Sequence, residues 1–487
     1  MDFLRKDREI DMLEGPVFKT IVIFALPILV SYLFQSLYNM VDTMIVGNVL
    51  GDNSLAAVGS TASIYELLVG FGMGLANGMT IVTARGYGSG DKELVRKSVA
   101  GCITIGLVAS VVVAVLGYLI LKPLLTILNT PEEIFQEAYD YISIIVIFGI
   151  VMFAYNLCSS LLRAIGNSVM PLLFLVFSSC LNIVLDLIFV LALRMGVKGA
   201  ATATVLAQTV SCILCIIYLW KKTEILRPAR EHFRFDRNLY KDLCSQGFAM
   251  AVMGSIVSVG SIILQYGINN LGTLTIAAHT AARKLCSFAM MPFGSMAMGA
   301  ATFVSQNRGA DKGERILKAI RSCCLCSVIM AAVMSVILYF TAEGIVRLIS
   351  GSSEAEVIEN GSMYLIINGP FYAVLGILFT LRYSLQGIGS KLLPLISSVI
   401  EFTGKALFVI FLIPHFGYMA VILCEPVLWC CMAAQLLWAY NHNPYIKETR
   451  TRVKTVKRAI RRGERVYLEK TEKPAQGETA EEPKEEA

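Results

Sequence analysis

Residues 17–46 read VFKTIVIFALPILVSYLFQSLYNMVDTMIV, and this stretch decides the fold class. A helix needs about 20 apolar residues to cross a bilayer, and this run is longer than that. It is also too long for the apolar core of a secretory signal, and no small-x-small cleavage site follows it. We therefore expect it to remain in the protein as a first transmembrane helix.

The composition of the rest of the chain agrees with a membrane location. Apolar residues make up 56% of the 487 positions and charged residues only 16%, whereas about a quarter of a soluble domain is charged. The mean hydropathy is +0.65. The 13 cysteines fall almost entirely inside apolar runs, where cysteine packs as a small hydrophobic residue. We expect neither a disulfide framework nor a cysteine metal site.

Further apolar runs predict an all-α protein with twelve transmembrane helices. The eleven runs after the first lie near residues 54–82, 95–121, 134–157, 168–193, 197–220, 240–268, 273–304, 316–340, 358–384, 392–413 and 416–440. This divides the chain into an N-terminal segment (1–16), a first six-helix lobe (17–220), a linker (221–239), a second six-helix lobe (240–440) and a charged tail (441–487). The tail has apolar residues at helical spacing among basic ones at Val453, Val456 and Ile460. It could lie on an anionic membrane surface or remain solvated and disordered.

The placement of basic residues predicts the orientation. Most of the 42 lysines and arginines fall in segments on one side of the predicted membrane. The loops on the other side hold only Lys122, Arg194, Lys198 and Arg347. Because cytoplasmic loops are enriched in lysine and arginine, we expect a multi-pass inner-membrane protein with both termini in the cytoplasm. The basic net charge follows from this bias, so we do not expect nucleic-acid binding.

The two halves of the chain carry an internal repeat. Short matches recur at one constant spacing: residues 55–57 (LAA) with 276–278 (IAA), Gly78 with Gly299, and Gly88 with Gly309. A second set pairs residues 163–166 (RAIG) and Pro171 with residues 386–389 (QGIG) and Pro394. Because each half contains an even number of spans, both halves enter the membrane with the same orientation. The lobes should therefore be related by a pseudo-two-fold axis along the membrane normal, with a substrate path between them.

Ionisable residues inside the spans are costly and require an explanation. In the first half these are all acids: Asp42, Glu66 and Asp186. The second half mixes both signs, at Arg283, Lys284, Lys405, Glu401 and Glu425. Glu401 and Lys405 are four residues apart on a helix and predict an internal salt bridge. Arg283 and Lys284 could line the path between the lobes or face the outer boundary.

The acids of the first half predict an ion site. Asn182 and Asp186 are four residues apart, so they share one helix face. Asp42 ends a polar stripe that also contains Gln35 and Asn39, with Tyr38 beside it, and Thr204 lies at a similar depth. Two carboxylates in a poorly hydrated site cannot both be ionised cheaply, so such a site should bind a proton or Na⁺. Alternatively, Asp42 caps a turn near Gly47, while Asn182 and Asp186 only bond neighbouring helices.

Four residues are candidates for binding substrate. Gln35 and Asn39 belong to the polar stripe, and Glu66 could attract a cation or hydrogen-bond a neighbouring helix. Met290, with other methionines nearby, would suit a promiscuous apolar pocket, although ordinary packing explains it equally well.

These features resemble the multidrug and toxic compound extrusion (MATE) family, in its DinF-like or a related bacterial branch. The resemblance covers residues 16–440. It is carried by Leu26-Pro27, Tyr38-Asn39-x-x-Asp42-x-x-x-Val46-Gly47, Arg163-Ala-x-Gly166 with Pro171, Asn182-x-x-x-Asp186, and Gly199-Ala200-Ala201-x-Ala-Thr204. It implies two lobes in a V shape and export of organic cations in exchange for H⁺ or Na⁺. It also implies a first-lobe cation site at Asp42, Asn182, Asp186 and Thr204, with Tyr38 and Tyr141 nearby.

The predicted function is therefore secondary active efflux of small organic cations or amphiphilic drugs by a monomer, with H⁺ or Na⁺ as coupling ion and no other cofactor. One branch of the MATE family instead has acids on its seventh and tenth helices, and residues 244–268 and 360–384 contain none. The main alternative is a flippase for a lipid-linked saccharide, which usually has more helices and a more cationic cavity. A membrane-embedded enzyme would need a polar catalytic cluster at a membrane face, and the short external loops carry none.

Overall fold

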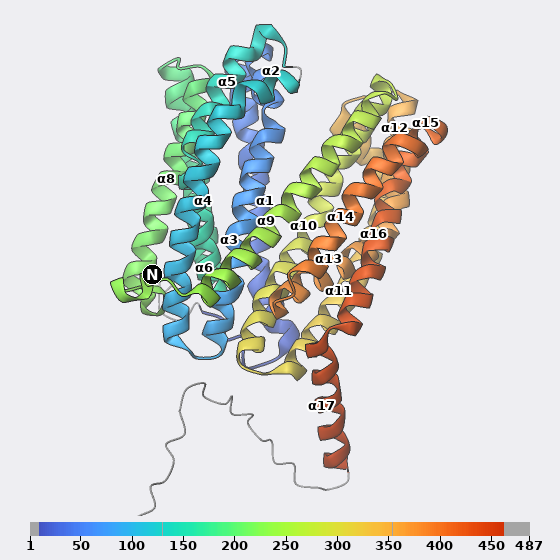
Figure 1. Cartoon of the computed structure of the whole chain (residues 1–487). Helices are drawn as coiled ribbons and strands as arrows, with labels where there is room; N and C mark the ends of the chain where they lie inside the picture. The colour runs from blue at the N-terminus through green and yellow to red at the C-terminus, as the bar shows by residue number, and fades with distance from the viewer. Residues whose placement is uncertain (1–8, 129, 353, 462–487) are drawn as a thin grey trace, which may run out of the picture.

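The computed structural model describes residues 9–128, 130–352 and 354–461, almost entirely as helices packed into two bundles (Figure 1). Eleven of its helical segments are long and apolar enough to span a membrane, and a bent helix pair makes the twelfth. The predicted twelve-helix, two-lobe fold is therefore confirmed.

The first lobe contains helices α1 to α8. Their bounds are α1 (Val17–Leu50), α2 (Asp52–Ser60), α3 (Ala62–Gly88), α4 (Lys92–Ile127), α5 (Glu132–Ile147), α6 (Gly149–Ala164), α7 (Val169–Asp186) with a π-helix at Leu187–Ala192, and α8 (Val197–Lys222). Two short 3₁₀ helices, Glu224–Leu226 and Arg230–Phe233, lead to the second lobe.

The second lobe contains helices α9 to α16. Their bounds are α9 (Arg237–Asn269), α10 (Thr273–Gly309), α11 (Gly313–Ser350), α12 (Ala355–Asn368), a 3₁₀ turn (Gly369–Phe371), α13 (Tyr372–Ile388), α14 (Leu392–Leu407) with a π-helix at Phe408–Leu412, α15 (Ile413–Phe416) and α16 (Tyr418–His442). Helix α17 (Pro444–Arg461) follows.

Three predicted spans are interrupted, each at a local backbone feature. The span predicted at 54–82 breaks at Thr61, whose hydroxyl donates to the Val58 carbonyl (2.7 Å) and so competes with the helical hydrogen bonds. The span predicted at 134–157 bends by 47° between α5 and α6, at Phe148 and Gly149. The span predicted at 358–384 contains a 3₁₀ turn at Pro370, which has no amide hydrogen to donate.

The lobes meet at one end of the molecule and diverge toward the other (Figure 1). We call the end where α1 begins the basal end and the opposite end the distal end. At the basal end, the last turns of α3 and α10 cross without room for a side chain. A Cβ atom on Gly88 would collide with the carbonyl oxygen of Gln306, and one on Gly309 would collide with that of Arg85. The two members of the sequence repeat thus make reciprocal contacts, as a pseudo-two-fold axis requires.

Polar contacts strengthen this basal closure. Asp242 of the second lobe pairs with Arg85 of the first lobe and with Lys391 of its own lobe (2.7 Å). The segment before α1 crosses between the lobes. The Ile10 amide donates to the Gly166 carbonyl (3.1 Å), and Arg315 donates to carbonyls on the same segment at 2.8–3.1 Å. The structure is therefore closed at the basal end.

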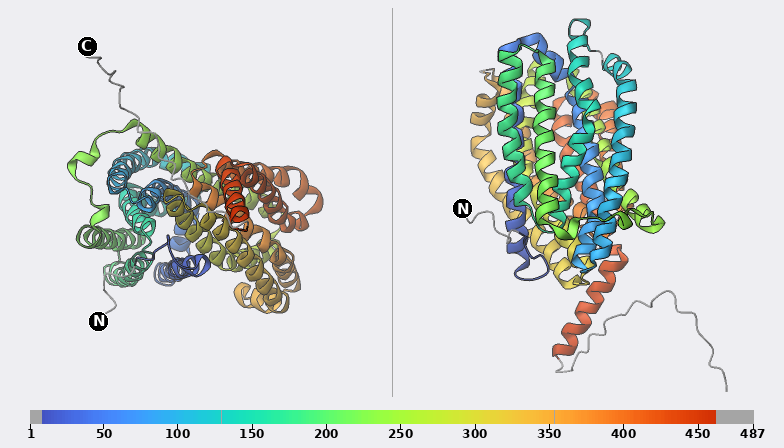
Figure 2. Two further views of the ribbon diagram at one scale, coloured as in Figure 1. Left: turned by 90° about the horizontal axis from the view of Figure 1, so that it is seen from below. Right: turned by 90° about the vertical axis from the view of Figure 1, so that its left-hand side faces the viewer.

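The beginning of the predicted charged tail is a helix rather than a disordered segment. Helix α17 projects from the basal end of the second lobe (Figures 1 and 2). Two ion pairs join it to the start of α11 and the turn before it: Arg452 with Asp311 (2.8 Å) and Lys457 with Glu314 (2.8 Å). Val453 is partly buried on the same side. The side chain of Ile460 and residues 462–487 lie outside the described part of the chain.

Candidate functional site

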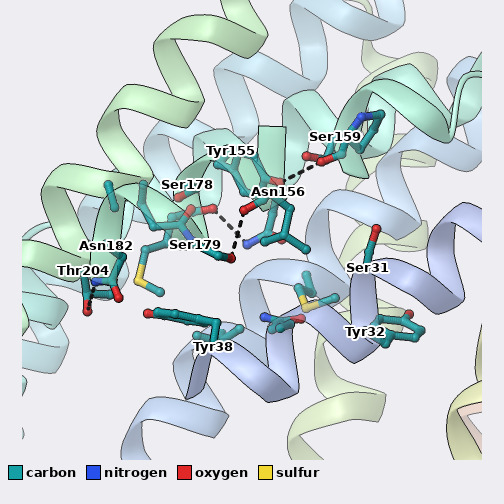
Figure 3. A pocket seen from close by; sticks show the side chains of 18 of the residues that line it. Ser31, Tyr32, Tyr38, Tyr155, Asn156, Ser159, Ser178, Ser179, Asn182 and Thr204 are labelled. Carbon is teal, nitrogen blue, oxygen red and sulfur yellow. Dashed lines mark hydrogen bonds between the residues drawn. The ribbon is translucent and has the colours of Figure 1, made fainter. Parts of the chain in front are cut away.

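A polar cavity lies inside the first lobe, between helices α1, α3, α6, α7 and α8 (Figure 3). The space inside it that no protein atom occupies is ≈ 870 Å³, part of it open to solvent. The side chains recur at helical spacing on each helix, which shows that one face of every helix points into the cavity. They are Ile28, Ser31, Tyr32, Gln35 and Tyr38; Tyr65, Val69 and Met73; Met152, Tyr155, Asn156, Ser159 and Arg163; Pro171, Leu175, Ser178, Ser179 and Asn182; and Thr204, Ala207 and Gln208.

Two carboxyl groups meet at the distal side of this cavity. Asp42 of α1 and Asp186, the last residue of α7, are close enough for their carboxyl groups to hydrogen-bond to each other. Asp186 is 0% exposed and Asp42 is partly buried. The Oδ1 atom of each is buried and meets no hydrogen-bond donor in the described part of the chain. The sequence prediction that these two acids converge agrees with this geometry.

Asn182 connects the acid pair to the cavity. It is buried one helical turn before Asp186. In the amide orientation that satisfies both of its ends, its nitrogen donates to Asp186 Oδ2 (2.9 Å) and its oxygen accepts from the Thr204 backbone amide (3.2 Å). Thr204 and Tyr38 line the same cavity, and their side chains lie close to each other. Asn182, Thr204 and Tyr38 therefore form one polar cluster with the two acids.

Two tyrosines also lie near the acid pair. Tyr141 of α5 lies within electrostatic reach of both Asp42 and Asp186, and Tyr65 of α3 lies near Asp42. Tyr141 is buried. Tyr65 was not predicted from the sequence, because nothing in its neighbourhood distinguishes it from a packing residue.

The backbone changes form directly after Asp186. A π-helix occupies Leu187–Ala192, and π-helical turns are rare and frequently found at functional sites. It widens the last turns of the span next to the acid pair. The apolar sequence of this stretch gave no indication of the change.

The chemistry available to the cluster is the binding of a small cation. Two carboxylates in contact, without a basic partner among the described residues around them, cannot both remain ionised unless a positive charge is shared between them. A proton can be shared by the two carboxyl groups. Carboxylate, amide and hydroxyl oxygens could instead hold Na⁺. No group of three or more His, Cys, Asp or Glu residues suited to a metal ion occurs in the described ranges.

The predicted substrate-binding residues are distributed differently. Gln35 lines the cavity, whereas Asn39 and Glu66 are exposed outside it and Met290 packs against the core of the second lobe. Glu66 lies one turn distal to Gly70, which faces α9 near Gly254. These four assignments remain predictions.

Most of the charges predicted inside the second-lobe spans are paired with one another, whereas Lys284 is exposed. The predicted salt bridge between Lys405 and Glu401 is present (3.0 Å), and Glu401 also lies 3.8 Å from Arg382. Arg283 pairs with Glu425 (2.6 Å). Arg382 is buried within α13, and it was not among the charged residues predicted to lie inside spans.

Lys405 occupies the position in the second lobe that Asn182 occupies in the first. The spacing that relates Pro171 to Pro394 also relates these two residues, and each is followed within a few residues by a π-helix. The ammonium group of Lys405 donates to Glu401 and to Ser261 (3.2 Å). The second lobe thus has the ammonium group of Lys405 at the position of Asn182, which in the first lobe lies beside the acid pair.

Several residues of the cavity were missed from the sequence. Ser178, Ser179, Asn156 and Ser159 are polar residues at helical spacing on two apolar helices. The same i, i+3, i+4 test that found the stripe on α1 would have found them.

Comparisons with known proteins give consistent similarities. The MatE family profile matches residues 27–188 and 249–412, one segment in each lobe. The probable multidrug resistance protein YoeA of Bacillus subtilis is 25% identical over 437 residues, which cover 88% of this chain and 94% of that protein. The multidrug export protein MepA of Staphylococcus saprophyticus is 21% identical, covering 81% and 88%. A solved structure described as the outward-facing conformation of a multidrug resistance MATE family transporter of the MOP superfamily has a TM-score of 0.81 at 22% identity, covering 93% and 100%.

Proposed function

Since the chain belongs to the multidrug and toxic compound extrusion family of membrane transporters, whose members are not enzymes, we propose that it exports small organic cations and amphiphilic drugs in exchange for H⁺ or Na⁺. The observation that carries this proposal is the contact between Asp42 and Asp186 beside a polar cavity. An acid pair without a counter-charge is a site for an exchangeable cation.

The coupling follows from where the two acids are attached. Asp42 belongs to α1 and Asp186 to α7, so their mutual repulsion, or the cation that removes it, acts on the packing of these two helices. Both helices also line the cavity. Entry of a cation into the acid pair therefore changes the cavity in which a substrate would sit, and this change expels the substrate.

The two ends of the molecule supply alternating access. The basal end, which we assign to the cytoplasm from its basic loops, is closed by the crossing of α3 and α10. The lobes diverge at the distal end (Figure 1). For a substrate without net charge, one coupling cation that moves down a potential of about 100 mV releases about 2.3 kcal/mol, which corresponds to a substrate gradient of roughly fifty-fold. A one-for-one exchange with a monovalent organic cation moves no net charge, and its driving force is then the concentration gradient of the coupling ion. Both termini are then cytoplasmic, and a single chain contains the whole path.

The alternative of a saccharide-lipid flippase is less well supported. Such proteins would be expected to have more helices and a cavity rich in basic residues, whereas the cavity described above has Arg163 as its one basic lining residue within the described chain.

Proteoliposomes containing the purified full-length protein test the proposal. We expect a fluorescent organic cation to move across the membrane when a proton gradient or a sodium gradient is imposed, and to stop when that gradient is collapsed. Transport that is equally fast without either gradient would contradict it. Empty liposomes and liposomes with the Asp42→Asn, Asp186→Asn double variant are the controls.

A further inference from the structure

One charged side chain of the first-lobe cavity has no role in the polar cluster around Asp42 and Asp186. Arg163, in the last turn of α6, lines the cavity at the end away from Asn182. Ser159, one turn earlier on α6, lies at that end together with Tyr32, while Asn182 and Thr204 lie at the other end (Figure 3). No aspartate or glutamate lines the cavity within the described chain.

Among the residues that the structure describes, the guanidinium group of Arg163 has only neutral hydrogen-bond partners. Its Nη2 atom donates to Ser160 Oγ (3.0 Å) and weakly to Asn77 Oδ1 (3.4 Å). Its Nε and Nη1 atoms donate to no protein atom among the residues that the structure describes, including the carbonyls at the end of its own helix. No carboxylate of these residues forms an ion pair with it within 4.0 Å.

Other guanidinium groups at comparable positions are neutralised. Arg382 has Glu401 at 3.8 Å and Ser397 at 2.9 Å, and Arg283 has Glu425 at 2.6 Å. A charge in a membrane-embedded protein interior without a partner is costly, and such residues generally mark a substrate or ion path. The helix C-terminus offers Arg163 some electrostatic stabilisation, but its Nε and Nη1 donors still have no acceptor among the described residues. An anionic group of a ligand would supply one.

The cavity is therefore electrically polar along its length. Its distal end adjoins the acid pair, and its other end carries Arg163. Pro171 and Asn182 of α7 both line it, and they are eleven residue steps apart, which corresponds to about 16 Å of helix. A ligand that bridges the two ends would need a positive group at one end and a negative group at the other.

We propose that the cavity recognises zwitterionic substrates, with the carboxylate of the substrate bound by Arg163 and its ammonium group directed toward Asn182 and the acid pair. The planar guanidinium offers Nε and Nη1, two donors that match the two oxygens of a carboxylate. Arg163 is then a specificity-determining residue. The proposal rests on the efflux function proposed above, because it assumes that the first-lobe cavity holds the exported molecule.

A matched pair of dyes measures what the charge of the carboxylate contributes to binding. Rhodamine B carries a free carboxylate and is a zwitterion, whereas its ethyl ester is a cation of nearly the same shape. Binding to the purified full-length protein is measured by fluorescence anisotropy, and transport is measured in proteoliposomes. The variants are Arg163→Gln and Arg163→Lys, with Lys284→Gln as a control that removes an exposed membrane-embedded cation outside the cavity.

We expect Arg163→Gln to weaken binding of the acid by about tenfold to a hundredfold, the range for a lost charge-assisted hydrogen bond, and to leave binding of the ester unchanged. Arg163→Lys should retain part of the preference, and Lys284→Gln should retain all of it. Equal weakening for acid and ester, or a wild-type protein that binds both equally, would overturn the proposal. A wild-type protein that binds the acid through Arg163 but transports neither dye would leave this assignment standing and overturn the efflux function instead.

Discussion

Replacing Asp186 by asparagine tests the proposed cation site at Asp42 and Asp186 while preserving its shape. The amide oxygen of the new side chain can still accept the hydrogen bond that Asn182 donates at 2.9 Å. Removing one of two like charges in contact also relieves repulsion in the unloaded state. We therefore expect the Asp186→Asn protein to fold and to unfold in detergent at a temperature no lower than the wild-type protein.

The size of the effect on cation binding follows from the geometry. A cation shared by the two carboxyl groups lies within about 4 Å of each, and at an effective dielectric constant of about 20 each carboxylate contributes about 4 kcal/mol. Loss of one carboxylate should therefore weaken cation binding by roughly a thousandfold, since about 1.4 kcal/mol corresponds to a factor of ten.

The assay measures cation-triggered release of a bound fluorescent substrate from the purified protein, first by lowering the pH without sodium and then by adding sodium at fixed pH. Whichever ion triggers release in the wild-type protein should be needed at about a thousandfold higher concentration in Asp186→Asn. Asp140→Asn is the matched control, because Asp140 pairs with Lys198 at a distance of 3.2 Å and should affect neither titration. A midpoint that moves less than tenfold in Asp186→Asn, or equally in Asp140→Asn, would refute the reasoning.

Three further changes test the lobes and their contacts. Gly88→Ala should lower the unfolding temperature or separate the basal ends of the lobes, because its Cβ would collide with a carbonyl oxygen. Gly294→Ala should be neutral or slightly stabilising, because no atom of the described residues lies near the position of its Cβ. Thermal unfolding of the two variants distinguishes them. Lys405→Met leaves Glu401 with a single, more distant basic neighbour, and should cost about 3–5 kcal/mol of stability, seen as a large drop in denaturation midpoint that Lys405→Arg largely avoids. Asp242→Asn removes the acid of the basal ion pairs, and should speed amide hydrogen exchange at the basal ends of α3 and α10 without affecting their distal ends; unchanged exchange would mean that the ion pairs do not hold the basal end closed.

The sequence was most informative about the number and relationship of the spans. Hydropathy alone identifies a run such as residues 17–46, because a bilayer imposes a length and an apolar composition together. The repeat that pairs Gly88 with Gly309 was visible as three short matches at one spacing. The structure gives the physical reason for this pair, which is the reciprocal close approach of two helix ends.

Breaks within the spans could not be predicted from hydropathy. An average over an apolar window does not register the hydroxyl of Thr61, which competes for a backbone carbonyl, or the π-helix after Asp186. These features depend on individual backbone hydrogen bonds, which apolar composition does not encode.

The candidate site was predicted in part, for a reason that is itself physical. Acids in an apolar span are conspicuous because their cost demands a partner, so Asp42 and Asp186 could be paired from the sequence. Arg163 was assigned to a loop, because the predicted span ended at residue 157, whereas α6 continues to Ala164. The end of a helix is the least certain part of such a prediction, and here it decided whether a charged residue was recognised as part of the cavity.

Infrared difference spectroscopy of the wild-type protein in lipid tests the central claim most directly, because carboxyl groups report their own protonation and ion binding. Adding a transported organic cation should displace the coupling ion and change the carboxyl bands, and this change should be absent from the Asp42→Asn, Asp186→Asn double variant. The account is contradicted if substrate binding leaves the carboxyl bands of the wild-type protein unchanged, or if the same change persists in the double variant.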